Sequence, residues 1–309
     1  MKKKIMLPVD DSTRSKQAVD YAVRLSALVR ELHYVLFHVQ PGISGFLADE
    51  AKTDFKARQQ MEKVMEKNAK EAVALMDQFK TRMVKGGISE DRIELVTQPK
   101  NMGIAKDIMD WAQQHIYDAV VVGRRGLSGV QKSIMGSLTS KLAAHAMVCP
   151  LWVIDGTPAS DKILLAVDGS ESSLKAVDHL SFMFEGNKEV KITLFHVTLK
   201  LSDYCEINFE DKGTDLEEIV TQGARRCVDR FFAHAQEKFK QAGIDEDQVE
   251  IKVSKRAIQG GKAIIDEAKN GGYGTVVVGR RGTGKAFFIG SVSKYVLDRA
   301  SDLALWLVS

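Results

Sequence analysis

The sequence is short of cysteine and of long apolar runs, and each shortage argues against a class of protein. The three cysteines, Cys149, Cys205 and Cys227, have no C-x-x-C spacing, so neither a disulfide framework nor a zinc site is expected. The apolar runs are far shorter than the roughly 20 residues that a membrane helix needs. The apolar stretch after the basic N-terminus is too short for a signal peptide and ends at Pro8, which predicts a cytoplasmic location.

A strong excess of one charge is also lacking. The chain has 44 Lys and Arg against 41 Asp and Glu, and residues 1–156 carry 23 basic and 18 acidic side chains against 21 and 23 in the remainder. Binding to a polyanion rests on several clustered phosphate contacts, so we expect neither nucleic acid nor a membrane as a partner. The length of 309 residues favours two globular domains.

The most informative feature is that the chain repeats itself. The segment KIMLPVDDS at 4–12 matches KILLAVDGS at 162–170, and FHV at 37–39 matches FHV at 195–197. Further along, VVVGRRG recurs at 120–126 and 276–282, GS at 136–137 and 290–291, and LW at 151–152 and 305–306. A period of about this length indicates a duplicated domain rather than a solenoid. We place the domains at 1–156 and 157–309, with the seam in turn-forming residues.

Within each half, short apolar runs alternate with amphipathic stretches. The runs are continuous and rich in Val, Ile and Leu, as in parallel strands buried on both faces. Strands are predicted at 5–9, 34–39, 93–96, 119–122 and 151–154, and at 162–167, 191–197, 249–253, 275–278 and 303–308. Helices are predicted at 12–31, 58–85, 103–116 and 137–146, and at 170–183, 215–241, 257–269 and 290–300. The fold class is therefore α/β, with two tandem open parallel-sheet, Rossmann-like domains of five strands each.

Two segments lack this order. Residues 40–54 and 198–214 follow the second strand of each half, and both a surface loop and a lid or partner-contact loop remain open for them. The long helices at 58–85 and 215–241 are interpreted as surface helices with one face on the sheet, and Met61, Met65 and Met76 as packing filler.

Candidate functional residues follow the strands, because open parallel sheets bind ligands beyond the carboxyl ends of their strands. Asp10 and Asp168 follow the first strand of each half, and each has helix capping as an alternative role. His38 and His196 lie at the second strand and are expected to be packed or surface residues without a catalytic role.

The glycine-rich GRRG segments follow the fourth strand of each half and lead to a Gly-Ser helix start. Helix N-termini attract phosphate, and glycines let backbone amides approach its oxygens, although a tight turn would explain the glycines equally well. The paired arginines at 124–125 and 280–281 face phosphate or solvent, with at least one of each pair expected in solvent. No Walker A motif, nucleophile–base pair or metal cluster is present in the sequence, so no catalytic residue is assigned.

The spacing G-x2-G-x9-G-S at 123–137, together with the Val-Asp, His-Val and Leu-Trp segments, resembles the ATP-binding branch of the universal stress protein family. The resemblance covers nearly the whole chain, twice. It implies an adenine nucleotide alpha-hydrolase-like fold in each domain. It further implies a stress or signalling role with weak ATP hydrolysis at most. A nucleotide-free interaction module of the same fold and a slow ATPase remain alternatives.

The resemblance also implies which residues bind the nucleotide. Adenine and ribose would lie at the ends of the first two strands, on Pro8, Val9, Asp10 and Val39, and in the second half on Ala166, Val167, Asp168 and Val197. Ribose and phosphates would lie on the glycine loop and helix start, on Gly123, Gly126, Gly136, Ser137 and Thr139, and in the second half on Gly279, Gly282, Gly290, Ser291 and Ser293. Mg²⁺ held through water by a nearby carboxylate is a further expectation.

The second half departs from this spacing, because seven residues instead of nine separate Gly282 from Gly290. We therefore expect the first site to bind nucleotide in preference to the second. The resemblance also predicts that the last strands, at 151–154 and 303–308, pair with each other within the chain. Association of two chains into a homodimer is left open.

Overall fold

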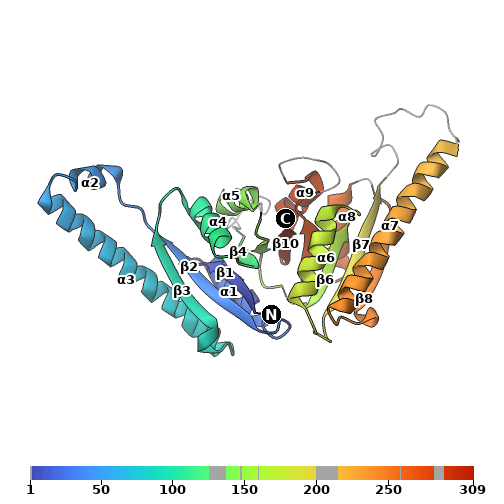
Figure 1. The fold of residues 1–309 in the computed structure, drawn as a ribbon, viewed down its shortest axis with the longest axis horizontal. Helices are drawn as coiled ribbons and strands as arrows, with labels where there is room; N and C mark the ends of the chain where they lie inside the picture. The colour runs from blue at the N-terminus through green and yellow to red at the C-terminus, as the bar shows by residue number, and fades with distance from the viewer. Residues whose placement is uncertain are drawn as a thin grey trace.

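The computed structural model describes residues 2–124, 137–146, 148–158, 160–199, 215–257, 259–281 and 289–309, in which strands and helices alternate (Figure 1). The first half contains β1 (Lys3–Pro8), α1 (Thr13–Leu25), β2 (Leu32–Gln40), α2 (Gly45–Glu50), α3 (Phe55–Lys85), β3 (Ile93–Pro99), α4 (Ile104–Gln114), β4 (Ala119–Gly123), α5 (Ser137–His145) and β5 (Leu151–Ile154). The second half contains β6 (Lys162–Val167), α6 (Glu171–Met183), β7 (Lys191–Leu199), α7 (Asp215–Gln241), β8 (Val249–Ala257), α8 (Gly260–Asn270), β9 (Thr275–Gly279), α9 (Ser291–Arg299) and β10 (Ala304–Val308).

The strands form one sheet in the order β3-β2-β1-β4-β5-β10-β9-β6-β7-β8. Neighbouring strands are parallel within each half, and β5 and β10 pair antiparallel at its centre. The predicted fold class is confirmed: each half is an open parallel α/β unit of five strands, in which the strand order reverses between the first and fourth strands.

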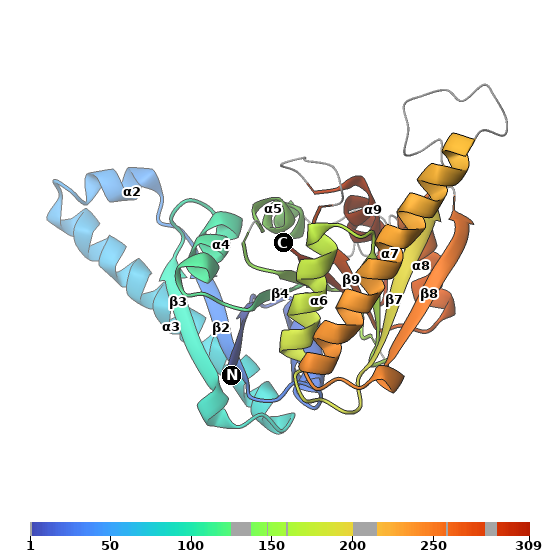
Figure 2. The same cartoon turned by 45° about the vertical axis from the view of Figure 1, so that its right-hand side comes forward.

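Helices cover both faces of the sheet, because successive residues of a strand point to opposite sides. In β4, Val121 packs into the cluster under α1, α3, α6 and α7, whereas Val120 and Val122 pack into the cluster under α4, α5, α8 and α9. Figure 2 shows α6 and α7 in front of the strands of the second half. The continuous apolar runs of the sequence are thus explained by strands buried on both sides.

A pair of tryptophans marks the centre of the sheet, where β5 meets β10. Trp152 and Trp306 lie opposite each other in the antiparallel register, and their rings stack with centroids 3.8 Å apart and planes 5° from parallel. Trp306 Nε1 donates a hydrogen bond to Tyr21 Oη at 2.9 Å, and Trp152 Nε1 donates to His179 Nε2 at 3.2 Å. Each tryptophan therefore bonds to the first helix of the other half.

Several predicted boundaries differ from the structure. The helix predicted at 12–31 ends at Leu25, where the Ser26 hydroxyl donates to the carbonyl of Val23 at 2.6 Å. Within the segment 40–54, α2 forms where Ser44 caps the backbone N–H of Leu47. The strand predicted to end at 253 continues to Ala257, so α8 begins later than expected. Of the second predicted loop, residues 200–214 lie outside the described residues.

The prediction for α3 is correct for only part of the helix. Met76, Phe79 and Met83 in its second half are buried against the sheet. Its first half extends past the sheet (Figure 1), and Met65 is 40% exposed there, so the interpretation of Met65 as packing filler is wrong. Among the described residues, none of the helices combines the length and apolar character needed to cross a membrane.

Candidate functional site

The candidate sites lie where the strand order reverses, between β1 and β4 and between β6 and β9. In the first half, the end of β4 touches the start of α1 so closely that a Cβ on Gly123 would come within 2.4 Å of the backbone oxygen of Arg14. A Cβ on Gly279 would likewise come within 2.8 Å of Ser172 Cβ. These two glycines are required by the close approach of the first helix of each half.

Asp10 lies two residues after the end of β1 and shapes the start of α1. Its Oδ1 accepts hydrogen bonds from the hydroxyls of Ser12 at 2.5 Å and Ser15 at 2.6 Å, and Ser12 in turn caps the helix. Partial burial raises the pKa of Asp10, but the hydrogen bonds from Ser12 and Ser15 outweigh it and hold the pKa below its usual value. The residue is exposed, and within the described residues its Oδ2 accepts no hydrogen bond.

Asp168 repeats this arrangement in the second half. Its Oδ1 accepts hydrogen bonds from the Ser173 hydroxyl at 2.7 Å and from the backbone N–H of Ser170 at 3.0 Å, and Ser170 caps α6. The N-caps of α1 and α6 are Ser12 and Ser170, so neither aspartate is the helix cap that the sequence left as an alternative; each instead orients the capping serine through a hydrogen bond. This bond occupies one carboxylate oxygen of each and is compatible with a ligand on the other.

A histidine on the second strand of each half contacts the end of the first strand. His38 Nδ1 lies 2.8 Å from the carbonyl oxygen of Val9, and His196 Nδ1 lies 2.9 Å from that of Val167. The histidines are thus packed residues, as expected. The other predicted residues of this part lie at the same strand ends, with Pro8, Val39 and Val197 partly buried and Val9, Val167 and Ala166 buried.

Two of the predicted hydroxyl donors at the helix starts, Thr139 and Ser293, bind the fourth strand of their own half. Thr139 Oγ1 donates to the carbonyl oxygen of Gly123 at 3.5 Å, and Ser293 Oγ donates to that of Gly279 at 2.6 Å. Both side chains are buried. In the second half, Gly290 is the N-cap of α9, and exposed Ser291 begins the helix. Gly126, Gly136 and Gly282 lie outside the described residues, as does the side chain of Ser137.

The first arginine of each GRRG segment crosses to the other half of the molecule, which the sequence analysis missed. The Arg124 guanidinium donates to the carbonyl of Asp298 in the last turn of α9. Arg280 Nη2 donates to the carbonyl of Ala144 in the last turn of α5 at 3.0 Å. Carbonyls of a last helical turn lack partners within the helix, so each arginine satisfies and stabilises the end of a helix in the opposite half.

Both crossing arginines are buried, with Arg124 4% and Arg280 2% exposed. Burial, with a smaller effect of Arg281, lowers the pKa of Arg280, and its buried Nη1 has no hydrogen-bond partner among the described residues. The expectation is that at least one arginine of each pair lies in solvent: Arg124 and Arg280 are the buried members, whereas Arg281 is partly exposed and Arg125 lies outside the described residues. The matched positions of Arg124 and Arg280 in the two copies are a signal that could have suggested a shared structural role.

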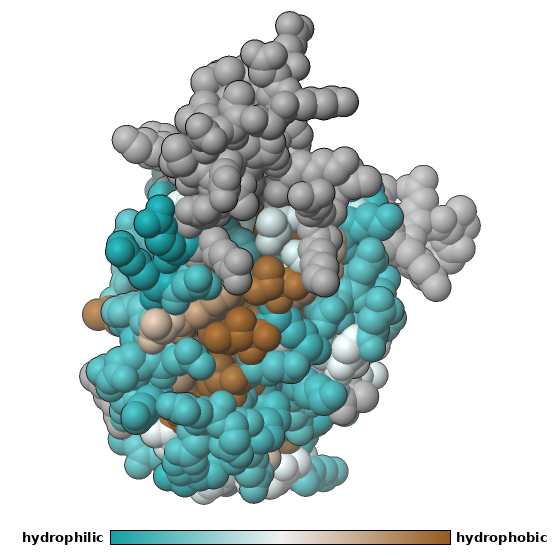
Figure 3. Space-filling model, turned by 90° about the vertical axis from the view of Figure 1, so that its right-hand side faces the viewer, coloured by the Kyte–Doolittle hydropathy of each residue, from teal (hydrophilic) through white to brown (hydrophobic). Residues whose placement is uncertain are grey.

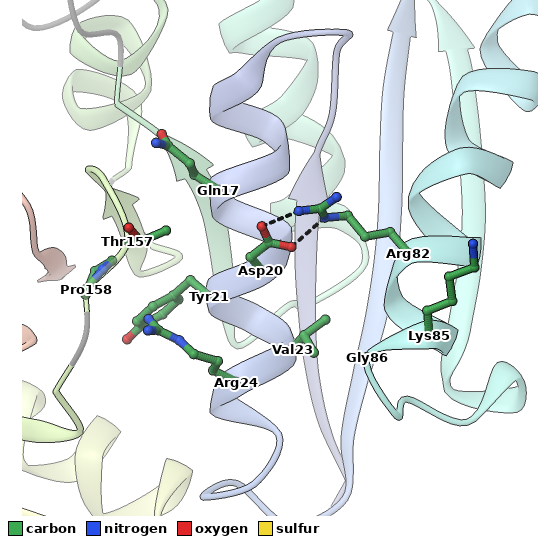
Figure 4. A pocket seen from close by; sticks show the side chains of 10 residues that line it. All are labelled: Gln17, Asp20, Tyr21, Val23, Arg24, Arg82, Lys85, Gly86, Thr157 and Pro158. Carbon is green, nitrogen blue, oxygen red and sulfur yellow. Dashed lines mark hydrogen bonds and ion pairs between the residues drawn. The ribbon is translucent and has the colours of Figure 1, made fainter.

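One cavity lies away from both switch points, beside the C-terminal half of α1 (Figure 4). Its volume is about 370 Å³. Tyr21 and Arg24 face the linker residues Thr157 and Pro158 across it, and the end of α3 forms the opposite side. Asp20 and Arg82 join the two helices through hydrogen bonds of 2.5 and 2.6 Å, marked in Figure 4.

The architecture is that of two tandem open parallel α/β units that share one sheet, and similarity to known proteins specifies the class. The model of the Universal stress protein family matches residues 1–155 and again residues 159–302. The chain therefore belongs to the universal stress protein family and contains its domain twice.

Two relatives and one solved structure are similar to the chain over different lengths. A universal stress protein of Mycolicibacterium smegmatis is 26% identical over 307 residues, which cover 96% of this chain and 94% of the relative. Universal stress protein YxiE of Bacillus subtilis is 23% identical over 153 residues, 49% of this chain and 97% of its own. The crystal structure of a universal stress protein from Archaeoglobus fulgidus has a similar fold, with a TM-score of 0.65 at 17% identity, covering 99% of this chain and 98% of the other.

Proposed function

We propose that this protein binds ATP or a related adenine nucleotide at its switch points and acts in a cytoplasmic stress response or in signalling. The observation that carries the proposal is the convergence, in each half, of an exposed aspartate, a glycine strand end and a helix start at the point of strand reversal. Parallel α/β proteins bind nucleotides at such points, and helix N-termini attract their phosphates.

Each group at the proposed site matches part of an adenine nucleotide. The Oδ2 atom of Asp10 or Asp168, which accepts no hydrogen bond from the described residues, can accept one from a ribose hydroxyl or an adenine amine. The helix starts at Ser137 and Ser291 supply backbone N–H groups for an anion. A divalent cation that accompanies the phosphates would find in the same carboxylate oxygen the type of ligand that Mg²⁺ prefers.

The crossing arginines support a link between the two sites. Arg124 follows the strand end of the first site and holds the last turn of α9, whose first turn belongs to the second site. Arg280 does the same for α5. A nucleotide that shifts one glycine loop would therefore shift the helix of the other site, which gives occupancy a route to conformation and partner contacts.

A nucleotide-free interaction module is the second candidate, and one observation favours it. The close approach of the first helix of each half is enough to explain the glycines at 123 and 279. The hydroxyls of Thr139 and Ser293 already donate hydrogen bonds to the carbonyls at the strand ends. These residues would be needed in a fold without a ligand as well.

Calorimetric titration of the nucleotide-stripped full chain with ATP, ADP and AMP separates the two candidates, with GTP as the control for the base. The variants Asp10→Asn and Asp168→Asn keep one oxygen acceptor for the helix-capping serines but remove the charge and replace the other oxygen with an NH2 group, which donates instead of accepting. Each should weaken one site by about tenfold or more, because it removes a hydrogen bond to a charged group. The second site should also be altered in affinity by the Asp10→Asn change if the sites are linked.

Two results would contradict the proposal. Protein that releases no adenine nucleotide on heating and gives no heat with ATP is an interaction module. Two sites of equal affinity, insensitive to both variants, would remove the aspartates from the site and refute the expected preference for the first half. Accumulation of ADP over many turnovers would place the protein among the slow ATPases.

A further inference from the structure

Among the described strands, β3 and β8 are the two edges of the sheet, and β8 is the edge with the more exposed apolar side chains. Ile251 is 38% exposed and Val253 is 53% exposed, although both lie on a strand. Figure 3 looks onto this side of the molecule and shows a band of hydrophobic side chains surrounded by hydrophilic ones. An exposed apolar edge strand presents unpaired N–H and C=O groups and is a template for another strand.

The opposite end, formed by β3, is protected in ways that β8 is not. β3 ends at Pro99, which cannot donate to a further strand. The helix α3 packs on both β2 and β3, and Leu95 is only partly exposed beneath it. Leu95 and Ile251 occupy the same place in the two halves, since β3 begins at Ile93 and β8 at Val249.

The residues of β8 are complementary to themselves when the strand is reversed. The sequence from 249 to 253 is Val-Glu-Ile-Lys-Val. In an antiparallel pair centred on residue 251, each Val249 faces a Val253 and each Glu250 faces a Lys252, while Ile251 faces its own copy. Opposite charges and β-branched pairs across antiparallel strands are stabilising. The equivalent residues of β3 run Ile-Glu-Leu-Val-Thr, with no cation to face the glutamate.

This symmetry identifies the partner. A two-fold interface requires that residue i contact residue j and that j contact i, which the pattern of β8 satisfies. The molecule already contains an antiparallel edge contact of this kind, between β5 and β10. We propose that a second copy of this chain pairs with β8, antiparallel and about a two-fold axis at Ile251, and extends the sheet across the dimer.

The charged side chains of β8 are placed to reach a second copy. Glu250 is 60% and Lys252 is 38% exposed. Lys252 Nζ lies 3.7 Å from Glu250 Oε2 and 3.3 Å from Glu267 Oε1 in its own chain. Because Lys252 also supports Glu267, charge reversal at Lys252 would disturb the fold, and the exposed apolar residues are the better targets.

Sedimentation velocity of the full chain at tens of micromolar tests the pairing. The unchanged chain should show a monomer–dimer equilibrium. The variants Ile251→Lys and Ile251→Glu should each weaken it by about tenfold or more, because residue 251 would face a like charge across the axis. A mixture of the two variants should recover dimers, since every pair then joins opposite charges.

The controls keep each outcome decisive. Leu95→Lys, at the matched position of β3, should leave the dimer intact. If circular dichroism shows that Ile251→Lys does not fold, Val253→Lys, at the more exposed position, takes its place. The proposal is overturned if the unchanged chain stays monomeric from tens of micromolar up to a 100 times higher loading concentration. It is also overturned if the dimer survives all the β8 variants. Two monomeric Ile251 variants that do not recover dimers on mixing would refute the two-fold axis at this residue.

Discussion

The two halves of the protein share the hydrogen bonds that orient the starts of their first helices. They differ in the exposure of their edge strands and in the residue that bonds to the central tryptophan of the other half. Asp10 with Ser15 and Asp168 with Ser173 make matching hydrogen bonds. In contrast, the edge strands β3 and β8 differ in exposure, and the stacked tryptophans bond to Tyr21 on one side and His179 on the other. The groups that orient the backbone at the strand ends are thus the same in the two halves, whereas the edge strands and the partners of the tryptophans are different.

The difference at the centre matters for electrostatics. Burial raises the pKa of Tyr21 to about 12 and lowers the pKa of His179 to about 4. Tyr21 therefore keeps one protonation state over the working pH range. His179, which must remain neutral to accept the hydrogen bond of Trp152, does not keep one state in acid.

Removal of the shared tryptophan stack should have the largest effect. Trp306 is fully buried, stacks on Trp152 and lies parallel to Phe184 at 5.9 Å. We expect Trp306→Ala to lower the free energy of unfolding by about 3–5 kcal/mol, through lost burial and the cavity left behind. Urea denaturation followed by circular dichroism measures the loss. Trp111→Ala, at a partly buried ring away from the centre, is the control and should cost less; equal losses would show that the stack has no special role.

Acid should lower the free energy of unfolding through His179 but not through Tyr21. The unfolded chain takes up a proton at His179 below pH 6.5, but the folded chain resists it until about pH 4, so this contribution to stability is full above pH 6.5 and is lost as the pH falls. The loss should approach about 3 kcal/mol. His179→Tyr, which copies the other half, should reduce the fall in the free energy of unfolding between pH 7 and pH 4. An unchanged pH profile in that variant would contradict the lowered pKa.

The smallest effect is expected from removing the serine–aspartate hydrogen bonds that both halves contain. Ser15→Ala and Ser173→Ala each remove a hydroxyl that donates to an aspartate Oδ1 and accepts from the aspartate backbone N–H. Each should cost about 1–2 kcal/mol, with similar values in the two halves. Ser15→Ala should also raise the pKa of Asp10, which NMR titration can follow. A loss confined to one half would show that the matching geometry does not mean matching energetics.

The fold was largely predictable because its signals are local. The apolar run at 119–122 and its copy at 275–278 required strands buried on two faces, and alternation with amphipathic segments required crossover helices. Boundaries were less certain where a single hydrogen bond decides them, as at Ser26, or where tertiary packing extends a strand, as in β8.

The candidate site was only partly readable from sequence. Asp10 and Gly123 were found because they follow strands, and their positions at the switch point agree with that reasoning. The destinations of Arg124 and Arg280 could not be read, because their partners are backbone carbonyls more than 130 residues away, and any residue type supplies a carbonyl.

The sequence by itself determined that one domain is present twice, since repeated motifs and hydrophobic periodicity are properties of the chain. Only the tertiary structure decided how the copies use their matched residues. Long-range contacts determine that Tyr21 and His179 serve opposite tryptophans, that the arginines cross between the halves, and that β3 is covered while β8 is exposed. These outcomes depend on which surfaces meet, and identical local sequences can meet different surroundings.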